Sequence, residues 1–130
     1  MKQKCKYIPE WTATYYDNLA EKEWDRLTQR PVDRVNHFVH SHYIQTFVKP
    51  KSRVLEVGAG PGRFTQVLAG LDCRVTVADL SKVQLRLHKQ YAKEFSFDHA
   101  VESRHRLDIC DMSSLPDLSL IHISEPTRPY

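Results

Sequence analysis

The feature that most constrains this chain is a glycine-rich stretch, VLEVGAGPGRF at residues 54–64, which overlaps a short apolar run. Residues 53–57 are largely apolar and β-branched and end at a glycine, which is typical of a buried parallel strand. From Gly62 the apolar residues recur at helical spacing until Gly70, where a helix ends easily. A strand that is joined to a helix by a glycine-rich turn is typical of the first unit of a layered α/β domain.

Hydrophobic periodicity predicts two helices before this strand and a further strand, helix and strand after it. Charges interrupt the apolar pattern of the third strand, so we place it near a sheet edge. This order implies right-handed crossovers and a parallel sheet of three strands. The predicted segments are helices at residues 11–27 and 31–47, a strand at 53–57, a helix at 62–69, a strand at 73–78, a helix that Ser81 caps and that continues toward Phe95, and a strand at 101–109.

Composition describes an ordinary globular chain and excludes several classes of protein. Of 130 residues, 41% are hydrophobic and 27% are charged, which excludes a disordered or collagen-like chain. No apolar run approaches the roughly 18 residues of a membrane span, and the start, MKQKCKYIPEW, lacks the apolar core of a secretory signal. A net charge of +3 is too mild and too dispersed to indicate nucleic acid or a membrane surface as a partner.

Cysteine and histidine usage indicates neither a disulfide framework nor a metal site. The three cysteines form no CxxC pair, which fits a reducing compartment, and we expect a cytoplasmic protein. His37 and His40 lie one helical turn apart with His42 nearby, but no acidic residue or cysteine stands at matching spacing to complete a zinc site. We therefore expect these histidines on a helix face and no bound metal.

The glycines and one acidic residue predict an adenosine-containing ligand. Gly58, Gly60 and Gly62 allow the backbone to turn sharply and to approach a ligand closely, beside the unpaired N–H groups of the helix that follows. Asp79 ends the second predicted strand, roughly 20 residues after Gly58, the spacing at which a carboxylate accepts both hydroxyls of a ribose.

The spacing of the glycines argues against two common nucleotide motifs. The dinucleotide pattern G-x-G-x-x-G requires its third glycine where this chain has Arg63. The triphosphate pattern G-x-x-x-x-G-K-[ST] also fails, because no Lys-Ser or Lys-Thr pair follows the loop. The pattern that remains is E-x-G-x-G-x-G.

These residues carry a resemblance to a known family. The segment from Glu56 to Arg63, together with Asp79-Leu80-Ser81, resembles the first two cofactor motifs of the class I S-adenosylmethionine (SAM)-dependent methyltransferases. The resemblance covers about half of such a domain and implies a Rossmann-like α/β fold, here an amino-terminal helical lead (1–52) and the first half of the cofactor-binding domain (53–117).

The resemblance also implies the cofactor contacts. Glu56 and the backbone from Gly58 to Gly60 face the methionine ammonium, Asp79 holds the ribose hydroxyls, and Arg63 is a candidate for the methionine carboxylate. After the third strand, Asp108 accepts from the adenine amino group and the Ile109 N–H meets the ring. The full set of expected cofactor residues is Glu56, Gly58, Ala59, Gly60, Gly62, Arg63, Asp79, Leu80, Asp108 and Ile109.

The reaction that the resemblance implies is methyl transfer from SAM to a small-molecule acceptor by the intact parent protein. A sulfonium donor needs no metal, so catalysis consists of holding a nucleophile in line and excluding water. No catalytic base can be named, because the family supplies it after the fourth strand, and we expect the fragment itself to be inactive. The alternatives are an NAD(P)-dependent oxidoreductase and a noncatalytic adenosine-ligand-binding domain; the oligomeric state stays open.

The end of the chain has a different character. Residues 118–128, LSLIHISEPTR, match the in-frame translation of a transposon-type sequencing-library adapter, and we expect residues 118–130 to be non-native. The other interpretation is a short apolar strand at 118–123 followed by a Pro-containing tail. If coding sequence stops near Asp117, residues 53–57 form an exposed apolar edge strand, which predicts poor solubility or partial folding.

Overall fold

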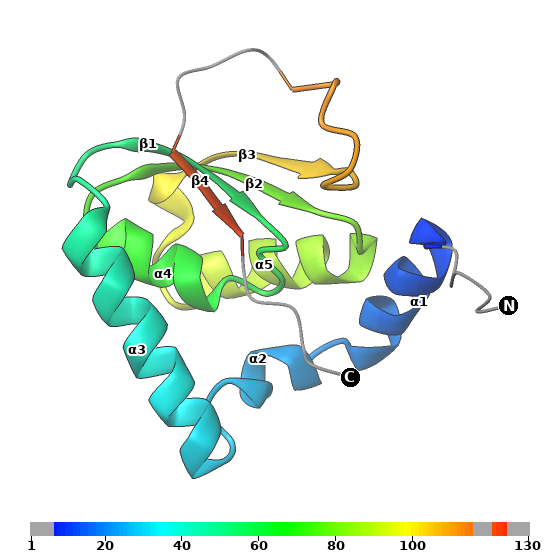
Figure 1. Cartoon of the computed structure of the whole chain (residues 1–130), viewed down its shortest axis with the longest axis horizontal. Helices are drawn as coiled ribbons and strands as arrows, with labels where there is room; N and C mark the ends of the chain where they lie inside the picture. The colour runs from blue at the N-terminus through cyan, green and yellow to red at the C-terminus, as the bar shows by residue number, and fades with distance from the viewer. Residues whose placement is uncertain (1–6, 116–120, 125–130) are drawn as a thin grey trace, which may run out of the picture.

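A computed structural model describes residues 7–115 and 121–124 of the chain. One parallel sheet in the order β3-β2-β1-β4 lies on one side of the molecule, and α4 and α5 pack beneath it (Figure 1). The elements are α1 (Pro9–Leu19), α2 (Lys22–Arg26), α3 (Pro31–Phe47), β1 (Arg53–Val57), α4 (Arg63–Gly70), β2 (Arg74–Asp79), α5 (Lys82–Glu94), the 3-10 helix η1 (Asp98–Ala100), β3 (Val101–Arg106) and β4 (Ile121–Ser124). The predicted Rossmann-like α/β class is confirmed.

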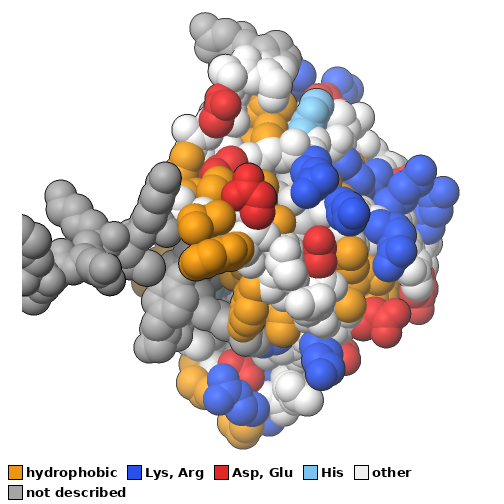
Figure 2. All heavy atoms as spheres, turned by 90° about the vertical axis from the view of Figure 1, so that its right-hand side faces the viewer, with side chains coloured by type: hydrophobic (Ala, Val, Ile, Leu, Met, Phe, Trp, Pro, Cys, Tyr) orange, Lys and Arg blue, Asp and Glu red, His pale blue; other side chains and the backbone are white. Residues whose placement is uncertain are grey.

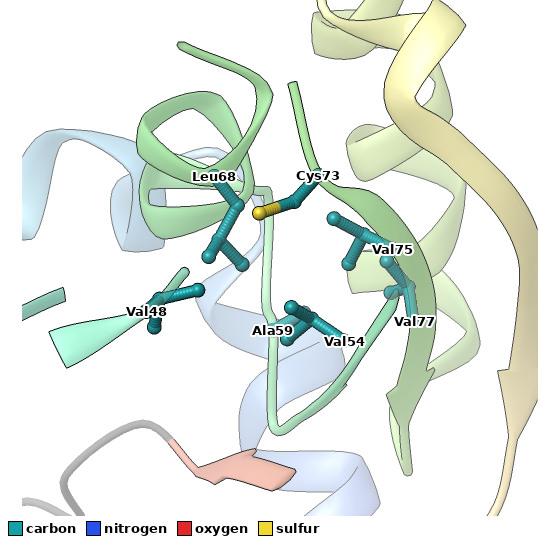
Figure 3. Packing of buried hydrophobic residues seen from close by; sticks show 7 residues of the cluster. All are labelled: Val48, Val54, Ala59, Leu68, Cys73, Val75 and Val77. Carbon is teal, nitrogen blue, oxygen red and sulfur yellow. The ribbon is translucent and has the colours of Figure 1, made fainter. Parts of the chain in front are cut away.

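The alternation of side chains along the strands divides the core into two faces. Val54 of β1 and Val75 and Val77 of β2 are fully buried on the helix-covered face, where they meet Leu68 of α4 (Figure 3). On the opposite face, Leu55 and Val57 pack with Ala78 and with the segment after β3. The helix-covered face therefore contains the larger core, and a single irregular segment covers the other face.

The amino-terminal helical lead differs from its prediction in one place. The predicted helix over 11–27 is divided into α1 and α2, because Ala20 adopts a left-handed φ of 44°. The side-chain amide of Gln84 in α5 donates to the carbonyls of Tyr16 and Ala20, at 2.8 and 3.1 Å, and so satisfies the end of α1. A tertiary contact therefore ends the first helix, at a position where the sequence has neither glycine nor proline.

The sheet contains a fourth strand, which corrects the expected three-strand sheet with an open β1 edge. β4 pairs in parallel with β1, from Val54 opposite Ile121 to Val57 opposite Ser124. The unpaired backbone N–H and C=O groups of an apolar edge strand pair readily with another extended segment. Here the backbone of residues 121–124 pairs with them. The remainder of the segment expected to be non-native, 118–120 and 125–130, lies outside the described residues.

The third strand lies at the sheet edge, as predicted, but it is shorter than expected. β3 pairs only with β2 and ends at Arg106. The chain turns directly afterwards, because the Asp108 carboxylate accepts the N–H of Cys110 at 3.0 Å.

The side of the molecule that carries α1 shows Lys and Arg side chains gathered on one flank and hydrophobic and acidic side chains mixed elsewhere (Figure 2). Within the described ranges, no helix has the length and apolar character that crossing a bilayer requires.

Candidate functional site

The glycine loop joins β1 to α4 at the carboxyl edge of the sheet. Gly58, Gly60 and Gly62 have φ values of 70°, 54° and 104°, which are readily adopted only by glycine. The Gly58 N–H donates to the Ala78 carbonyl at 2.8 Å, which ties the loop to the end of β2, and Ala59 is fully buried in the core. A side chain at Gly58 would meet no atom of the described residues within 4 Å, so among them this side of the loop is open to a ligand.

Gly62 serves a different purpose from the one expected. A Cβ at this position would lie 2.9 Å from Phe97 Cζ and 3.0 Å from His88 Cδ2. The close neighbour that requires glycine here is the protein core, whereas the sequence predicted a ligand. Gly62 therefore seats the loop on the side chains of α5 and of the segment before η1.

Asp79 lies at the end of β2, beside the loop, as predicted. Its two carboxylate oxygens accept the N–H groups of Gly60 and Ser81, both at 2.8 Å. Burial raises the pKa of Asp79, although both hydrogen bonds oppose that shift. The neighbouring Leu80 lies at the rim, where its carbonyl accepts from Arg106 Nε at 3.2 Å. Asp79 thus links the loop to the start of α5.

Glu56 points away from the open side of the loop. It is fully buried, and its Oε1 accepts the hydroxyl of Thr65 in α4. Thr65 Oγ1 lies 2.9 Å from His88 Nε2, and His88 Nδ1 accepts from Arg104 Nε at 2.9 Å. Arg104 also forms an ion pair with Asp98 at 2.9 Å. We call Glu56, Thr65, His88 and Arg104 the buried polar chain.

The direction of every hydrogen bond in the buried polar chain follows from Arg104. A guanidinium can only donate, so His88 Nδ1 is an acceptor and the ring proton is on Nε2, from which it reaches Thr65. The Thr65 hydroxyl then donates to Glu56. Burial, with the Arg104 charge, lowers the pKa of His88 to about 3, so the ring is neutral near pH 7.

Arg63 does not reach the open side of the loop. Its Cζ lies 3.9 Å from the centroid of the Trp24 ring, and its Nε donates to the Trp24 carbonyl at 2.9 Å. A further contact joins Nη2 to the Thr28 hydroxyl at 3.3 Å. Trp24 also stacks on Tyr91 of α5, with 4.5 Å between centroids. The residue expected to hold a carboxylate instead fastens α2 to α4 by a cation–π contact and hydrogen bonds.

Two side chains that the sequence did not assign to the site lie beside Gly60, and a third, Tyr16, is close to one of them. Glu23 of α2 is 5% exposed and Gln84 of α5 is fully buried; Glu23 Cγ and Gln84 Oε1 lie 3.8 and 4.0 Å from where a Gly60 Cβ would be. Tyr16 of α1 is close enough that the Glu23 charge adds to burial in raising its pKa. Helical spacing alone predicts a core or solvent role for these residues, so no sequence signal separates them from their neighbours.

Asp108 and Ile109 lie after β3, at the same edge of the sheet. The Tyr7 hydroxyl donates to Asp108 Oδ1 at 3.3 Å, and the Ile109 side chain is 46% exposed. His37 and His40 lie on α3, where both rings contact Phe64 of α4. Over the residues that the structure describes, no group of three or more histidine, cysteine or acidic side chains could hold a metal ion.

Comparison with known proteins identifies the family. A family model described as a methyltransferase domain matches residues 55–120, half of the chain, and includes the glycine loop, Asp79 and Asp108. The chain belongs to this methyltransferase domain family. No curated protein sequence matches it.

Solved structures show the same fold as this methyltransferase domain. The DhpI–SAH complex is 25% identical, with 75% of this chain and 44% of that chain covered and a TM-score of 0.53. Magnesium protoporphyrin IX methyltransferase from Synechocystis PCC 6803, with bound SAM, is 15% identical, with 85% and 59% covered and a TM-score of 0.61. The [4+2]-cyclase SpnF is 16% identical, with 82% and 44% covered and a TM-score of 0.66. The chain therefore spans about half the length of each of these proteins.

Proposed function

We propose that this methyltransferase domain binds SAM at the glycine loop and is the cofactor-binding part of an enzyme that methylates a small-molecule acceptor. The observation that carries the proposal is the junction at the carboxyl edge of the sheet, where Gly60 and Asp79 are joined by a 2.8 Å hydrogen bond beside the open face of Gly58. Ligands of open α/β sheets bind at this edge. The SAM and SAH named for two of the matched structures support the same ligand.

The residues present fit such a cofactor. SAM has a sulfonium and an ammonium but no phosphate, and the buried oxygens of Glu23 and Gln84 beside the loop favour a positively charged ligand. We assign Gly58, Ala59 and Gly60 to the backbone contacts, Asp79 and Leu80 to the ribose end, and Asp108 and Ile109 to the adenine end.

Glu56, Gly62 and Arg63 support the site from behind. Glu56 anchors the loop to α4 through Thr65, Gly62 seats it on Phe97, and Arg63 holds α2 over it. SAM, when bound, supplies an electrophilic methyl group. The protein orients the cofactor and keeps water from it, and the nucleophile is an atom of the acceptor.

A noncatalytic role or a different reaction on the same cofactor is the second candidate. SpnF, which is named as a [4+2]-cyclase, has this fold with a TM-score of 0.66, so the fold by itself does not decide the reaction. An NAD(P)-dependent oxidoreductase has less support, because Arg63 occupies the place of the third dinucleotide glycine. The unpaired thiols of Cys73 and Cys110 support a cytoplasmic location.

Calorimetric titration of the full chain with SAM, SAH and NAD⁺ tests the ligand. We expect SAM and SAH to bind and NAD⁺ to show no heat of binding. Binding of NAD⁺ in preference to SAH would contradict the proposal. The variant D72N removes one carboxylate from the exposed loop before β2. It should bind SAH as the wild type does, and it is the control for variants that remove a carboxylate from the site.

We also propose that residues 118–130 are a translated adapter, and this bears on the acceptor assay. Sequencing the source DNA across codons 110–130 tests it: a reading frame that departs from LSLIHISEPTR and continues into further strands supports the proposal, whereas the same codons followed by a genomic stop refute it. Methyl transfer is then assayed on the longest protein that the locus encodes, with a metabolite extract as the source of acceptors.

A further inference from the structure

Two side chains beside Gly60 each carry a buried oxygen that lacks a hydrogen-bond donor. Within the described part of the chain, Glu23 Oε2 and Gln84 Oε1 are buried and have no hydrogen-bond partner. The two side chains come from α2 and α5, which are far apart in sequence, and they meet at one point of the glycine loop. Native proteins satisfy nearly all buried acceptors, so a pair of them at one place indicates a ligand that donates.

The orientation of each oxygen is set by the contacts of its partner atom. Arg26 Nε donates to Glu23 Oε1 at 2.7 Å, which leaves the other carboxylate oxygen for a ligand. Gln84 Nε2 donates to the carbonyls of Tyr16 and Ala20. Both of those partners are acceptors, so the amide cannot be flipped, and Oε1 must be the atom directed at Gly60.

The charge around the two oxygens favours a cation. Asp79 lies close enough to Glu23 for the charge of Glu23 to help raise the Asp79 pKa, so two carboxylates share this side of the loop. The nearest cation, Arg26, is engaged with Glu23 Oε1, and Arg63 is held against Trp24. A primary ammonium carries three N–H donors and one positive charge, which matches two acceptor oxygens in an acidic setting.

We propose that Glu23 Oε2 and Gln84 Oε1 form the subsite for the α-ammonium group of the bound cofactor. The inference rests on the proposed function, and it assigns to Glu23 the contact that the sequence predicted for Glu56. Glu56 is separated from the open side of the loop and hydrogen-bonded to Thr65. The helical lead is therefore part of the cofactor site, since α2 supplies the carboxylate and α1 fixes the amide of Gln84.

Three ligands that differ in the amino-acid part of the molecule test the subsite in the full chain by calorimetry. SAH carries the ammonium, its 2-hydroxy analogue replaces that ammonium by a hydroxyl, and 5′-methylthioadenosine lacks the amino-acid part. We expect the wild type to bind SAH about 10- to 100-fold more tightly than the hydroxy analogue, the range for a charge-assisted hydrogen bond. Equal affinity for the two would overturn the subsite.

The variants E23Q and D25N separate a specific contact from a general effect of charge. Asp25 lies on the same helix but is exposed, so D25N removes the same charge away from the loop and should bind SAH as the wild type does. E23Q should weaken SAH binding about 10- to 100-fold and leave the affinity for 5′-methylthioadenosine unchanged, with a cooperative melt retained. Equal losses for both ligands, or no loss for SAH, would contradict the inference.

The same titrations distinguish failure of this inference from failure of the proposed function. A wild-type chain that binds 5′-methylthioadenosine and SAH equally well still has an adenosine site at the loop, but it has no ammonium subsite. A wild-type chain that binds neither ligand overturns the proposed function and the subsite with it.

Discussion

The two sides of the glycine loop differ in the segments that their buried polar groups contact. Beneath the loop, the buried polar chain runs from Arg104 to Glu56 with donors and acceptors in sequence, and Gly62 lies against Phe97. Above it, among the residues that the structure describes, Glu23 and Gln84 each have a buried oxygen without a hydrogen-bond partner, and nothing lies within 4 Å of a Gly58 Cβ. The lower side therefore stabilises the fold, whereas the upper side presents oxygen acceptors beside Gly60.

Protonation of His88 at low pH should destabilise the lower side of the loop. This is the largest change in the free energy of unfolding that we expect. The folded-state pKa of about 3 lies below the ordinary 6.5, so the neutral ring contributes stability that is present above pH 6.5 and is lost as the pH falls toward 3. At about 1.4 kcal/mol per pKa unit, the loss reaches about 3 to 5 kcal/mol. Urea unfolding between pH 7 and pH 4 measures it. In H88Q the same interval should show a much shallower slope; an unchanged slope would mean that His88 is not the group responsible.

Gly62→Ala should also break the lower side. The added Cβ would lie 2.9 Å from Phe97 on a backbone with φ of 104°, so overpacking and backbone strain act together. We expect a loss of about 3 kcal/mol in the free energy of unfolding. Gly58→Ala is the matched control, because its φ is 70° but its Cβ meets open space. It should lose only about 1 to 2 kcal/mol, and equal losses in the two variants would show that packing against Phe97 does not matter.

Thr65→Val tests the lower side of the loop by removing one hydroxyl from the buried polar chain. His88 then loses its acceptor and Glu56 loses one donor, while the side-chain shape is kept. We expect the free energy of unfolding to fall by about 1 to 3 kcal/mol, measured by urea titration at pH 7. T65S restores the hydroxyl and should recover most of the loss. A stable T65V with an unstable T65S would assign the effect to the methyl group instead.

Asp79→Asn tests the upper side and should have the smallest effect on stability. The amide oxygen can keep one of the two backbone hydrogen bonds, and removal of a buried charge offsets loss of the other. We expect a change of less than about 1 kcal/mol in the free energy of unfolding together with a loss of about tenfold in SAH affinity. Thermal melting and calorimetry measure the two quantities. A large loss of stability with unchanged affinity would place Asp79 on the structural side of the comparison.

Local patterns were sufficient for the order of the elements from α3 to β3, apart from the short 3-10 helix η1. The strand at 53–57 and the helix over 31–47 have the predicted bounds, and Ser81 caps α5 by accepting the Gln84 N–H at 3.2 Å. These features depend on neighbours in the chain, namely β-branched runs, proline at a helix start and a hydroxyl at an N-cap. The break at Ala20 could not be predicted in this way, because it depends on a side chain of α5.

The candidate site was predicted in part for the same reason. Asp79 beside Gly60 follows from the order of two adjacent parallel strands, which brings the carboxyl ends together at one edge of the sheet. Arg63 and Glu56 occupy motif positions, yet the structure directs the first to Trp24 and the second to Thr65. A motif specifies which residue is present, but its partners are set by elements that the motif does not contain.

The sequence by itself determined the α/β fold, the glycine loop and the family, because each depends on short-range periodicity and on residues within a single strand-to-helix turn. Only the tertiary structure decided which carboxylate faces the loop, since Glu23 and Glu56 differ by the side of the loop from which they approach. Burial and hydrogen bonding act between distant segments: they join Glu56 Oε1 to Thr65 beneath the loop and bring Glu23 from α2 to Gly60.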